Sequence, residues 1–201
     1  LASGQSAITL SILNLAGAGD SVAASPSLYG GSFNLFKHTL TRLGITPQWV
    51  EDPTDPESWR AAADETTRAF FVESIPNPKH DIPDLRAVAD VAHEAGVPLI
   101  VDNTVATPFL LRPIEHGADI VVHSATKFLG GHGTSIAGVL VDGGSFDFAA
   151  HGDKYPQFNE PDESYNGLVF SQVPAPFATR ARVTLLRDLG PAISPFNAFL
   201  I

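Results

Sequence analysis

The 201-residue chain contains no cysteine. That absence excludes disulfide bonds, metal sites held by thiolates and a cysteine nucleophile, although it says little about the cellular compartment. Basic residues are also few, because 12 Lys and Arg against 22 Asp and Glu give a formal net charge of −10. This negative balance argues against non-specific binding to nucleic acid or to anionic membranes, which requires basic patches. Anionic ligands must therefore be held by local donors.

Long apolar runs are missing as well. No stretch approaches the roughly 18 uninterrupted apolar residues of a membrane span. The first residues, Leu1-Ala2-Ser3-Gly4, lack the basic-then-apolar layout of a secretory signal. We therefore predict a cytoplasmic protein with no membrane partner. With 44% hydrophobic and 17% charged residues, the composition is that of a folded chain, and the length suits one domain.

Several common site motifs are absent. The run Gly17-Ala18-Gly19 lacks the third glycine and the preceding strand of a dinucleotide-binding fingerprint. Lys127 precedes its glycines, whereas the lysine of a phosphate-binding P-loop follows them. No Gly-x-Ser-x-Gly elbow of a serine hydrolase occurs. The histidines show no paired spacing typical of metal ligands, so we expect no metal site.

Apolar runs and amphipathic patterns alternate along the chain. Predicted strands lie at 20–25, 45–50, 68–74, 97–101, 120–122 and 136–142, and predicted helices at 4–16, 33–43, 56–63, 81–95, 109–116 and 177–189. We expect Asp81 to cap its helix and both Leu43 and Leu189 to lie on buried stripes. The segment 143–176 is irregular and is predicted to lie near the mouth of the site. The alternation predicts an α/β fold, with a mostly parallel sheet flanked by helices.

The most informative stretch is Ser124-Ala-Thr126-Lys127, which follows the predicted strand at 120–122 and precedes a glycine-rich turn. In open α/β sheets, ligand sites collect at the carboxyl ends of strands. A lysine there can be desolvated, which favours the neutral, nucleophilic amine. Ser124 and Thr126 would offer hydroxyl donors to an anion beside it. The alternative is an ordinary solvated loop lysine.

A second strand end carries a carboxylate. The short apolar run at 97–101 ends in Asp102. That aspartate either caps the next helix or acts together with Lys127. A lysine amine and a carboxylate from adjacent strand ends are what pyridoxal phosphate requires, because the amine forms a Schiff base and the anion keeps the pyridine nitrogen protonated. The pair is therefore more informative than either residue alone.

With these residues, the chain resembles the Cys/Met-metabolism family of pyridoxal-phosphate-dependent enzymes. The resemblance rests on Asp102-Asn-Thr at the end of one strand and on Ser124-Ala-Thr-Lys127 with Gly-Gly-His-Gly-Thr-Ser after it, and it covers essentially all 201 residues. Within the family, the runs at 128–136 and 160–165 are most similar to the O-acetylhomoserine sulfhydrylases. The implied fold is the large domain of the aspartate-aminotransferase type, known as fold type I.

The resemblance also implies roles for individual residues. It places the cofactor phosphate on the backbone amides of the helix start at 3–5, where small residues leave N–H groups free; a plain helix cap is the alternative. Tyr29 would stack on the cofactor ring and help to release the leaving group, and Asn77 would bond the ring oxygen. Lys127, Tyr29 and Asp102 are the implied catalytic residues. The complete expected cofactor site is Ser3, Gly4, Gln5, Tyr29, Asn77, Asp102, Ser124, Thr126 and Lys127.

The implied activity is γ-replacement on O-acetyl-L-homoserine, a step of methionine biosynthesis. Sulfide or a thiol would displace acetate and give homocysteine or methionine. A sister enzyme of the family, cystathionine γ-synthase or a γ-lyase, is the first alternative, although Gly131-His132-Gly133-Thr134 is unlike the lyase sequence. An alternative of another class is a catalytically inactive oligomerisation or ligand-binding module, which visible absorbance of the pure protein would separate from the enzymes.

The resemblance finally implies a larger assembly, a homotetramer built from dimers that share active sites. Family enzymes hold the cofactor phosphate with a tyrosine and an arginine from the N-terminal segment of a neighbouring subunit. They hold the substrate carboxylate with an arginine of a C-terminal domain. Neither part has a counterpart in this sequence. We therefore expect residues 1–201 to be the central cofactor-binding large domain of a longer, oligomeric enzyme.

Overall fold

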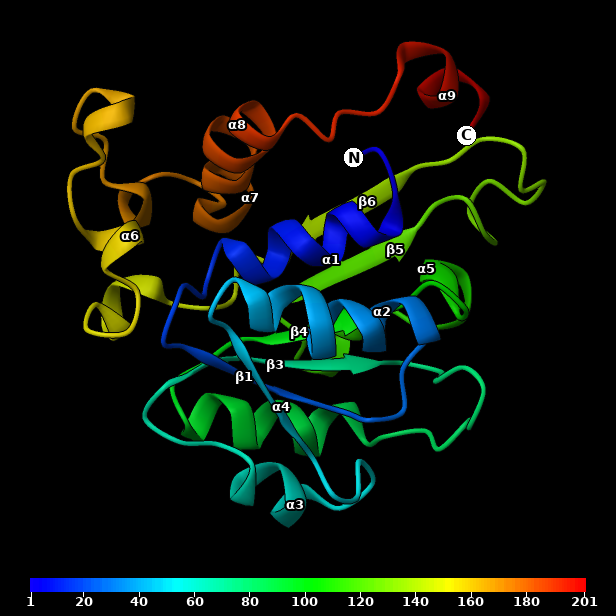
Figure 1. Cartoon of the computed structure of the whole chain (residues 1–201), viewed down its shortest axis with the longest axis horizontal. Coiled ribbons are helices and arrows are strands. Elements are labelled where there is room, and N and C mark those ends of the chain that lie inside the picture. Colours follow the sequence, from blue (N-terminus) through cyan, green and yellow to red (C-terminus); the bar gives the residue numbers. More distant parts are fainter.

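Six strands form one sheet in the computed structural model, which describes residues 1–201 (Figure 1). They are β1 (Ser21–Ala24), β2 (Thr46–Trp49), β3 (Thr67–Glu73), β4 (Leu99–Asp102), β5 (Ile120–Ser124) and β6 (Gly138–Asp142). Their order is β2-β1-β3-β4-β5-β6, and only the β5–β6 pair is antiparallel. The predicted mostly parallel sheet is confirmed. The chain order reverses between β1 and β3, which is where open α/β sheets bind ligands.

Helices cover both faces of the sheet. They are α1 (Gly4–Leu13), α2 (Gly30–Asn34), α3 (Pro56–Ala61), α4 (Leu85–Glu94), α5 (Thr107–Leu110), α6 (Pro156–Asn159), α7 (Pro176–Arg180), α8 (Arg187–Leu189) and α9 (Pro195–Leu200). In Figure 1, α1 and α2 lie above the central strands and α3 and α4 below them. Because helices cover both faces, the inner strands are buried along almost their whole length and do not alternate between buried and exposed residues.

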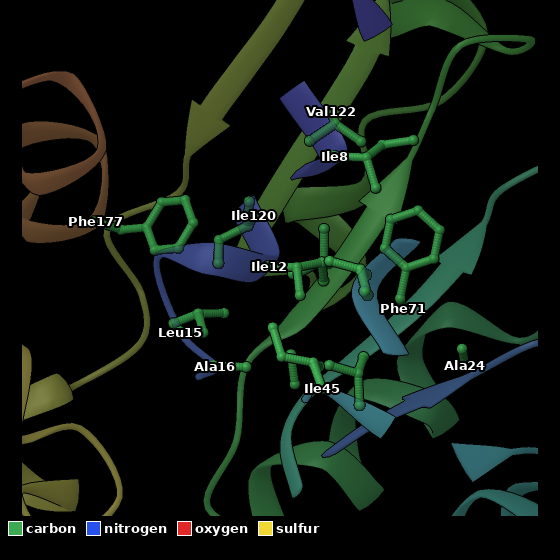
Figure 2. Packing of buried hydrophobic residues seen from close by; sticks show 14 of the residues in the cluster. Ile8, Ile12, Leu15, Ala16, Ala24, Ile45, Phe71, Ile120, Val122 and Phe177 are labelled. Carbon is green, nitrogen blue, oxygen red and sulfur yellow. The ribbon is translucent and has the colours of Figure 1, made fainter. Parts of the chain in front are cut away.

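Each face of the sheet has its own apolar cluster. On one face, Ile8 and Ile12 of α1 pack near Phe71 of β3, as Figure 2 shows. On the other face, Trp59 of α3 stacks on Phe70, with ring centroids 5.3 Å apart. Phe70 and Phe71 belong to different clusters because successive strand residues point to opposite faces. This packing holds α1 against β5, with the start of the helix at the carboxyl end of that strand.

Because of prolines, two of the helices differ from those predicted from the sequence. Asp81 does not cap the helix that follows it, because Pro83 disfavours helical geometry at the residue before it. The cap is Asp84, which accepts hydrogen bonds from two backbone N–H groups in the first turn of α4. Asp81 instead accepts a bond of 2.6 Å from the Ser27 hydroxyl. The helix predicted at 109–116 is two pieces, α5 and a 3-10 turn at Pro113–His116, because Pro113 interrupts it in the same way.

Two helices contain π-helical segments, at Leu35–Leu40 and Ala181–Leu186. A π-helical turn contains more residues than an α-helical turn, so an apolar stripe that is regular in sequence rotates away from the core beyond it. Leu43, predicted to be buried, is 49% exposed, and Leu189 is 57% exposed. Thr184 is buried in the second helix instead. The predicted inner faces of these helices are therefore wrong at their carboxyl ends.

The sequence predicted that the segment 143–176 lies near the mouth of the candidate site, and this prediction is wrong. The segment packs at the amino end of β3, where the Tyr155 hydroxyl donates to the Arg68 carbonyl at 2.8 Å. Its aromatic side chains stack on one another, with the Phe148 and Phe158 rings 4.2 Å apart. In Figure 1 it is the yellow ribbon on the side of the molecule away from the N-terminus. Burial of these rings places the segment there.

Candidate active site

One cavity of about 410 Å³ lies at the carboxyl ends of the central strands. Its walls come from the start of α1 and from the segments that follow β1, β3, β4 and β5. All nine predicted site residues line it, namely Ser3, Gly4, Gln5, Tyr29, Asn77, Asp102, Ser124, Thr126 and Lys127. The fold therefore brings together every residue that the sequence singled out. The role of each residue stays a prediction.

The start of α1 presents unused backbone donors to this cavity. Ser3 is the N-cap, and its hydroxyl accepts from the backbone N–H of Ser6 at 3.1 Å. The N–H groups of Gly4 and Gln5 have no acceptor within the protein. A Cβ on Gly4 would lie 2.6 Å from the Ser124 Cβ, so only glycine lets the helix start lie directly against the end of β5. The site thus has the free donors and helix dipole that favour an anion.

Two hydroxyls lie beside this helix start. The Ser124 Oγ has no partner within the protein, while its backbone N–H donates to Thr104 Oγ1 at 2.8 Å. The Thr126 hydroxyl is already in use, because it donates to the Ala137 carbonyl at 3.3 Å and accepts from the Ala137 N–H at 3.1 Å. Ser124 is therefore a free donor, whereas Thr126 also ties the turn after β5 to the segment before β6.

Asp102 ends β4 with one carboxylate oxygen unpaired. Its Oδ1 accepts from the Thr104 N–H at 3.0 Å and from the Thr104 hydroxyl at 2.5 Å, and its Oδ2 has no donor within the protein. Burial raises the pKa of Asp102 to about 6, although the bonds from Thr104 lower it. No cationic side chain pairs with it. A partly buried carboxylate with no cation beside it would be stabilised by a positively charged ligand group at Oδ2.

Lys127 lies on the rim of the cavity. Its side chain is exposed, and its amine makes no hydrogen bond or ion pair within the protein. Of the two sequence-based alternatives, a desolvated or a solvated lysine, the exposure in this chain matches the solvated one, and the neighbouring Phe128 is 67% exposed as well. The amine is nevertheless free to react with a ligand in the cavity.

Tyr29 and Asn77 complete the cavity on the side of β1 and β3. Tyr29 is half exposed, and its ring covers Gly31, where a Cβ would lie 2.6 Å from the ring carbon Cε1. Asn77 lies in the turn after β3, and its carboxamide has no partner within the protein. Both side chains therefore have polar atoms available to a ligand.

Glu73 is a cavity residue that the sequence reasoning missed. It ends β3, is 5% exposed, and accepts hydrogen bonds from the backbone N–H groups of Tyr29 at 2.7 Å and Asn77 at 3.3 Å. Burial raises the pKa of Glu73 to about 7; the bond from Tyr29 lowers it, the charge of Asp102 raises it, and the bond from Asn77 lowers it. A signal was present, because an apolar run ending in an acid is the pattern that singled out Asp102.

Thr104 was missed as well. It donates its hydroxyl to Asp102 Oδ1 and accepts the N–H of Ser124, so it joins the carboxyl ends of β4 and β5. A threonine two residues after a strand gives no sequence signal of this kind. The contact depends on β4 and β5 being neighbours, which only the folded sheet decides.

A mostly parallel sheet with a lysine and a buried carboxylate at adjacent strand ends is the layout of fold-type-I pyridoxal-phosphate enzymes. Residues 1–201 match the family described as Cys/Met metabolism PLP-dependent enzyme over their whole length. The chain belongs to this family. The family resemblance predicted from the sequence is confirmed.

Relatives and solved structures agree with this assignment. The chain is 53% identical to an O-acetyl-L-homoserine sulfhydrylase of Leptospira meyeri, covering 100% of this chain and 47% of that protein. It is 50% identical to a homocysteine synthase of Schizosaccharomyces pombe, covering 99% of this chain and 47% of that protein. A crystal structure described as an O-acetylhomoserine (thiol)-lyase of Campylobacter jejuni, with N′-pyridoxyl-lysine-5′-monophosphate, superposes with a TM-score of 0.94 at 41% identity, covering 100% of this chain and 49% of that one.

The chain spans about half the length of the relatives that it matches. None of its helices combines the length and the apolar character that crossing a membrane requires.

Proposed function

We propose that residues 1–201 form the pyridoxal-phosphate-binding large domain of an O-acetylhomoserine sulfhydrylase. The observation that carries this proposal is the convergence in one cavity of the Lys127 amine, the unpaired Oδ2 of Asp102 and the free N–H groups at the start of α1. Identity of 53% to a sulfhydrylase over the whole chain supports the choice within the family.

The unpaired atoms of the cavity fit this cofactor group by group. The N–H groups of Gly4 and Gln5 and the Ser124 hydroxyl would hold the phosphate, which needs several donors. Asp102 Oδ2 would hold the protonated ring nitrogen, and the adjacent cation would keep that carboxylate ionised. When bound, pyridoxal phosphate supplies an electron sink for the carbanion formed at the substrate α carbon.

The remaining roles belong to side chains around the ring. Lys127 would hold the cofactor covalently and, after the substrate amine takes its place, would move protons at the α and β carbons. Tyr29 would stack on the ring, and its hydroxyl would assist the departure of acetate from the γ carbon. Asn77 would donate to the ring oxygen. Thr126 would line the cavity near the phosphate, while its hydroxyl stays bonded to Ala137.

In the proposed reaction, acetate leaves O-acetyl-L-homoserine and sulfide or a thiol takes its place, giving homocysteine or methionine. The sulfur donor, the homotetramer of dimers that share active sites, and the cytoplasmic location stay predictions from the family resemblance. The half-length coverage of the relatives supports the further prediction that the domain works within a longer chain.

Product analysis tests the proposal. The longer chain to which residues 1–201 are proposed to belong is incubated with O-acetylhomoserine, O-succinylhomoserine or cystathionine, each with and without sulfide. We expect acetate and homocysteine from O-acetylhomoserine only when sulfide is present. Cleavage of cystathionine without sulfide would identify a γ-lyase, and preference for O-succinylhomoserine would favour a γ-synthase. A protein without a visible absorption band after addition of pyridoxal phosphate would be an inactive module.

A further inference from the structure

Glu73 is a buried carboxylate on the wall of the cavity to which the proposed function assigns no role. It is the last residue of β3 and lies beside the strand β1, at the point where the chain order of the sheet reverses. Its register partner on β4 is Asp102. Glu73 therefore lies between the segment that carries Tyr29 and the aspartate proposed to hold the ring nitrogen.

The two oxygens of Glu73 serve two different loops. Oε1 accepts the N–H of Tyr29 at 2.7 Å, and Oε2 accepts the N–H of Asn77 at 3.3 Å. Neither N–H has a second acceptor within the protein. Tyr29 follows β1 and Asn77 follows β3, so one carboxylate fixes the backbone of two loops whose side chains face the same cavity. We call this arrangement the Glu73 clamp.

Only a carboxylate of this length satisfies both donors. A glutamine has the same size but one acceptor oxygen, and its amide nitrogen would face the second N–H without accepting from it. An apolar side chain would leave both N–H groups without a partner. Burial of a carboxylate is itself unfavourable, so packing alone does not account for an acid at this position.

We propose that Glu73 is a positioning residue of the cofactor site, whose clamp fixes the backbone of Tyr29 and Asn77 so that the phenol ring and the carboxamide stay in place against the ligand. The identity of the ligand rests on the proposed function. The clamp is a property of this chain and is present without any ligand, so it can be tested in the protein before and after cofactor is added.

The first test uses the full chain without cofactor. Backbone amide exchange is measured by NMR for the wild type, Glu73→Gln and a matched control, Asp119→Asn, which alters a buried carboxylate outside the cavity. In Glu73→Gln we expect the amide of Tyr29 or of Asn77 to exchange about tenfold faster than in the wild type. The amide of Asn103, which donates to the Val122 carbonyl at 2.9 Å, is the internal reference and should not change. Unchanged exchange at both clamped amides would overturn the proposal.

The second test measures the dissociation constant of pyridoxal phosphate by visible absorbance. We expect Glu73→Gln to bind about tenfold more weakly than the wild type, and Asp119→Asn to bind as the wild type does. Equal binding by Glu73→Gln and the wild type would overturn the positioning role, even if the amides loosen. If Glu73→Gln does not fold, Glu73→Asp takes its place, because it keeps the charge but is too short to reach both loops. Failure of the wild type to form any lysine adduct would overturn the proposed function and this role with it.

Discussion

Carboxylates near the two ends of the sheet differ in their hydrogen-bond partners. At the amino end, Asp119 precedes β5 and is 2% exposed. Its Oδ2 accepts from His93 Nε2 at 2.8 Å and from the Leu99 N–H at 2.9 Å, and its Oδ1 accepts from the Ser145 hydroxyl at 2.8 Å. At the carboxyl end, Asp102 and Glu73 have only neutral donors, and Asp102 Oδ2 has none. Asp119 is thus fully bonded within this chain, whereas Asp102 has one oxygen free.

This difference in bonding distinguishes polar groups that stabilise the fold from polar groups that are free to bind a ligand. Another ion pair at the amino end joins Arg68 to Asp20 at 2.9 Å. At the carboxyl end the Lys127 amine, the Ser124 hydroxyl and two N–H groups of α1 have no internal partner. These groups line one cavity, so a ligand bound there would meet several free donors together.

The largest expected effect comes from removing the amine at the carboxyl end. Lys127→Ala should lose covalent attachment of the cofactor and essentially all turnover, because no other lysine lines the cavity. The measurement is the yellow absorption band of the wild type, fixed by borohydride and located by mass spectrometry. Lys154, which donates to the Thr67 carbonyl at the amino end, is the matched control. Lys154→Ala should retain the adduct, and an adduct that persists in Lys127→Ala would contradict the assignment.

Asp102→Asn and Asp119→Asn compare the two carboxylates directly. Asp102→Asn should keep much of the cofactor binding but lower kcat about 100-fold or more, since a neutral amide does not stabilise a protonated ring nitrogen. Asp119→Asn should keep kcat and lower the free energy of unfolding by about 2 kcal/mol, because it weakens a satisfied buried network. Steady-state kinetics and chemical denaturation measure both. Near wild-type turnover in Asp102→Asn would remove that residue from the mechanism.

The two ends should also respond to pH in different windows. The raised pKa values of Glu73, about 7, and Asp102, about 6, mean that the folded protein without cofactor binds more protons than the unfolded chain between about pH 4 and 7. Its free energy of unfolding should therefore fall as pH rises through that window, on the order of 3 kcal/mol for Glu73. The pKa of His93 is raised chiefly by its bond to Asp119. The stability that this bond contributes is therefore present below about pH 6.5 and is lost at higher pH.

Denaturation curves at several pH values check this separation. Glu73→Gln should reduce the fall in the free energy of unfolding between about pH 4 and 7. His93→Gln should remove only the loss of stability at higher pH. Addition of pyridoxal phosphate should also reduce the change in the free energy of unfolding between about pH 4 and 7, because a bound cation keeps Asp102 ionised. If the free energy of unfolding of Glu73→Gln changes between about pH 4 and 7 as it does in the wild type, Glu73 does not titrate in that range.

The smallest expected effects come from two serines, one at each end. Ser124→Ala should weaken cofactor binding several-fold and leave stability unchanged, because its hydroxyl has no partner within the protein. Ser145→Ala should lower the free energy of unfolding by about 1 kcal/mol and leave cofactor binding unchanged, because its hydroxyl donates to Asp119. Cofactor titration and thermal unfolding of both variants provide the comparison. Reversed effects would contradict the division of roles.

Local sequence was enough to predict the α/β fold and the main residues of the cavity. The apolar runs predicted as strands at 97–101 and 120–122 lie in or overlap β4 and β5, and those strands end at Asp102 and Ser124 in the structure. Capping signals and prolines also act locally, although Asp81 shows that a proline two residues later overrides a cap. The sequence therefore determined the order of the elements and the positions of Lys127 and Asp102 in that order.

Only the tertiary structure decided how these elements meet. Glu73 joins Tyr29 and Asn77 because β1 lies beside β3, and Thr104 joins Asp102 to Ser124 because β4 lies beside β5. The segment 143–176 lies at the amino end because its aromatic rings bury together there. Strand neighbours and the packing of distant rings depend on contacts across the whole chain, and no local pattern of residues specifies them.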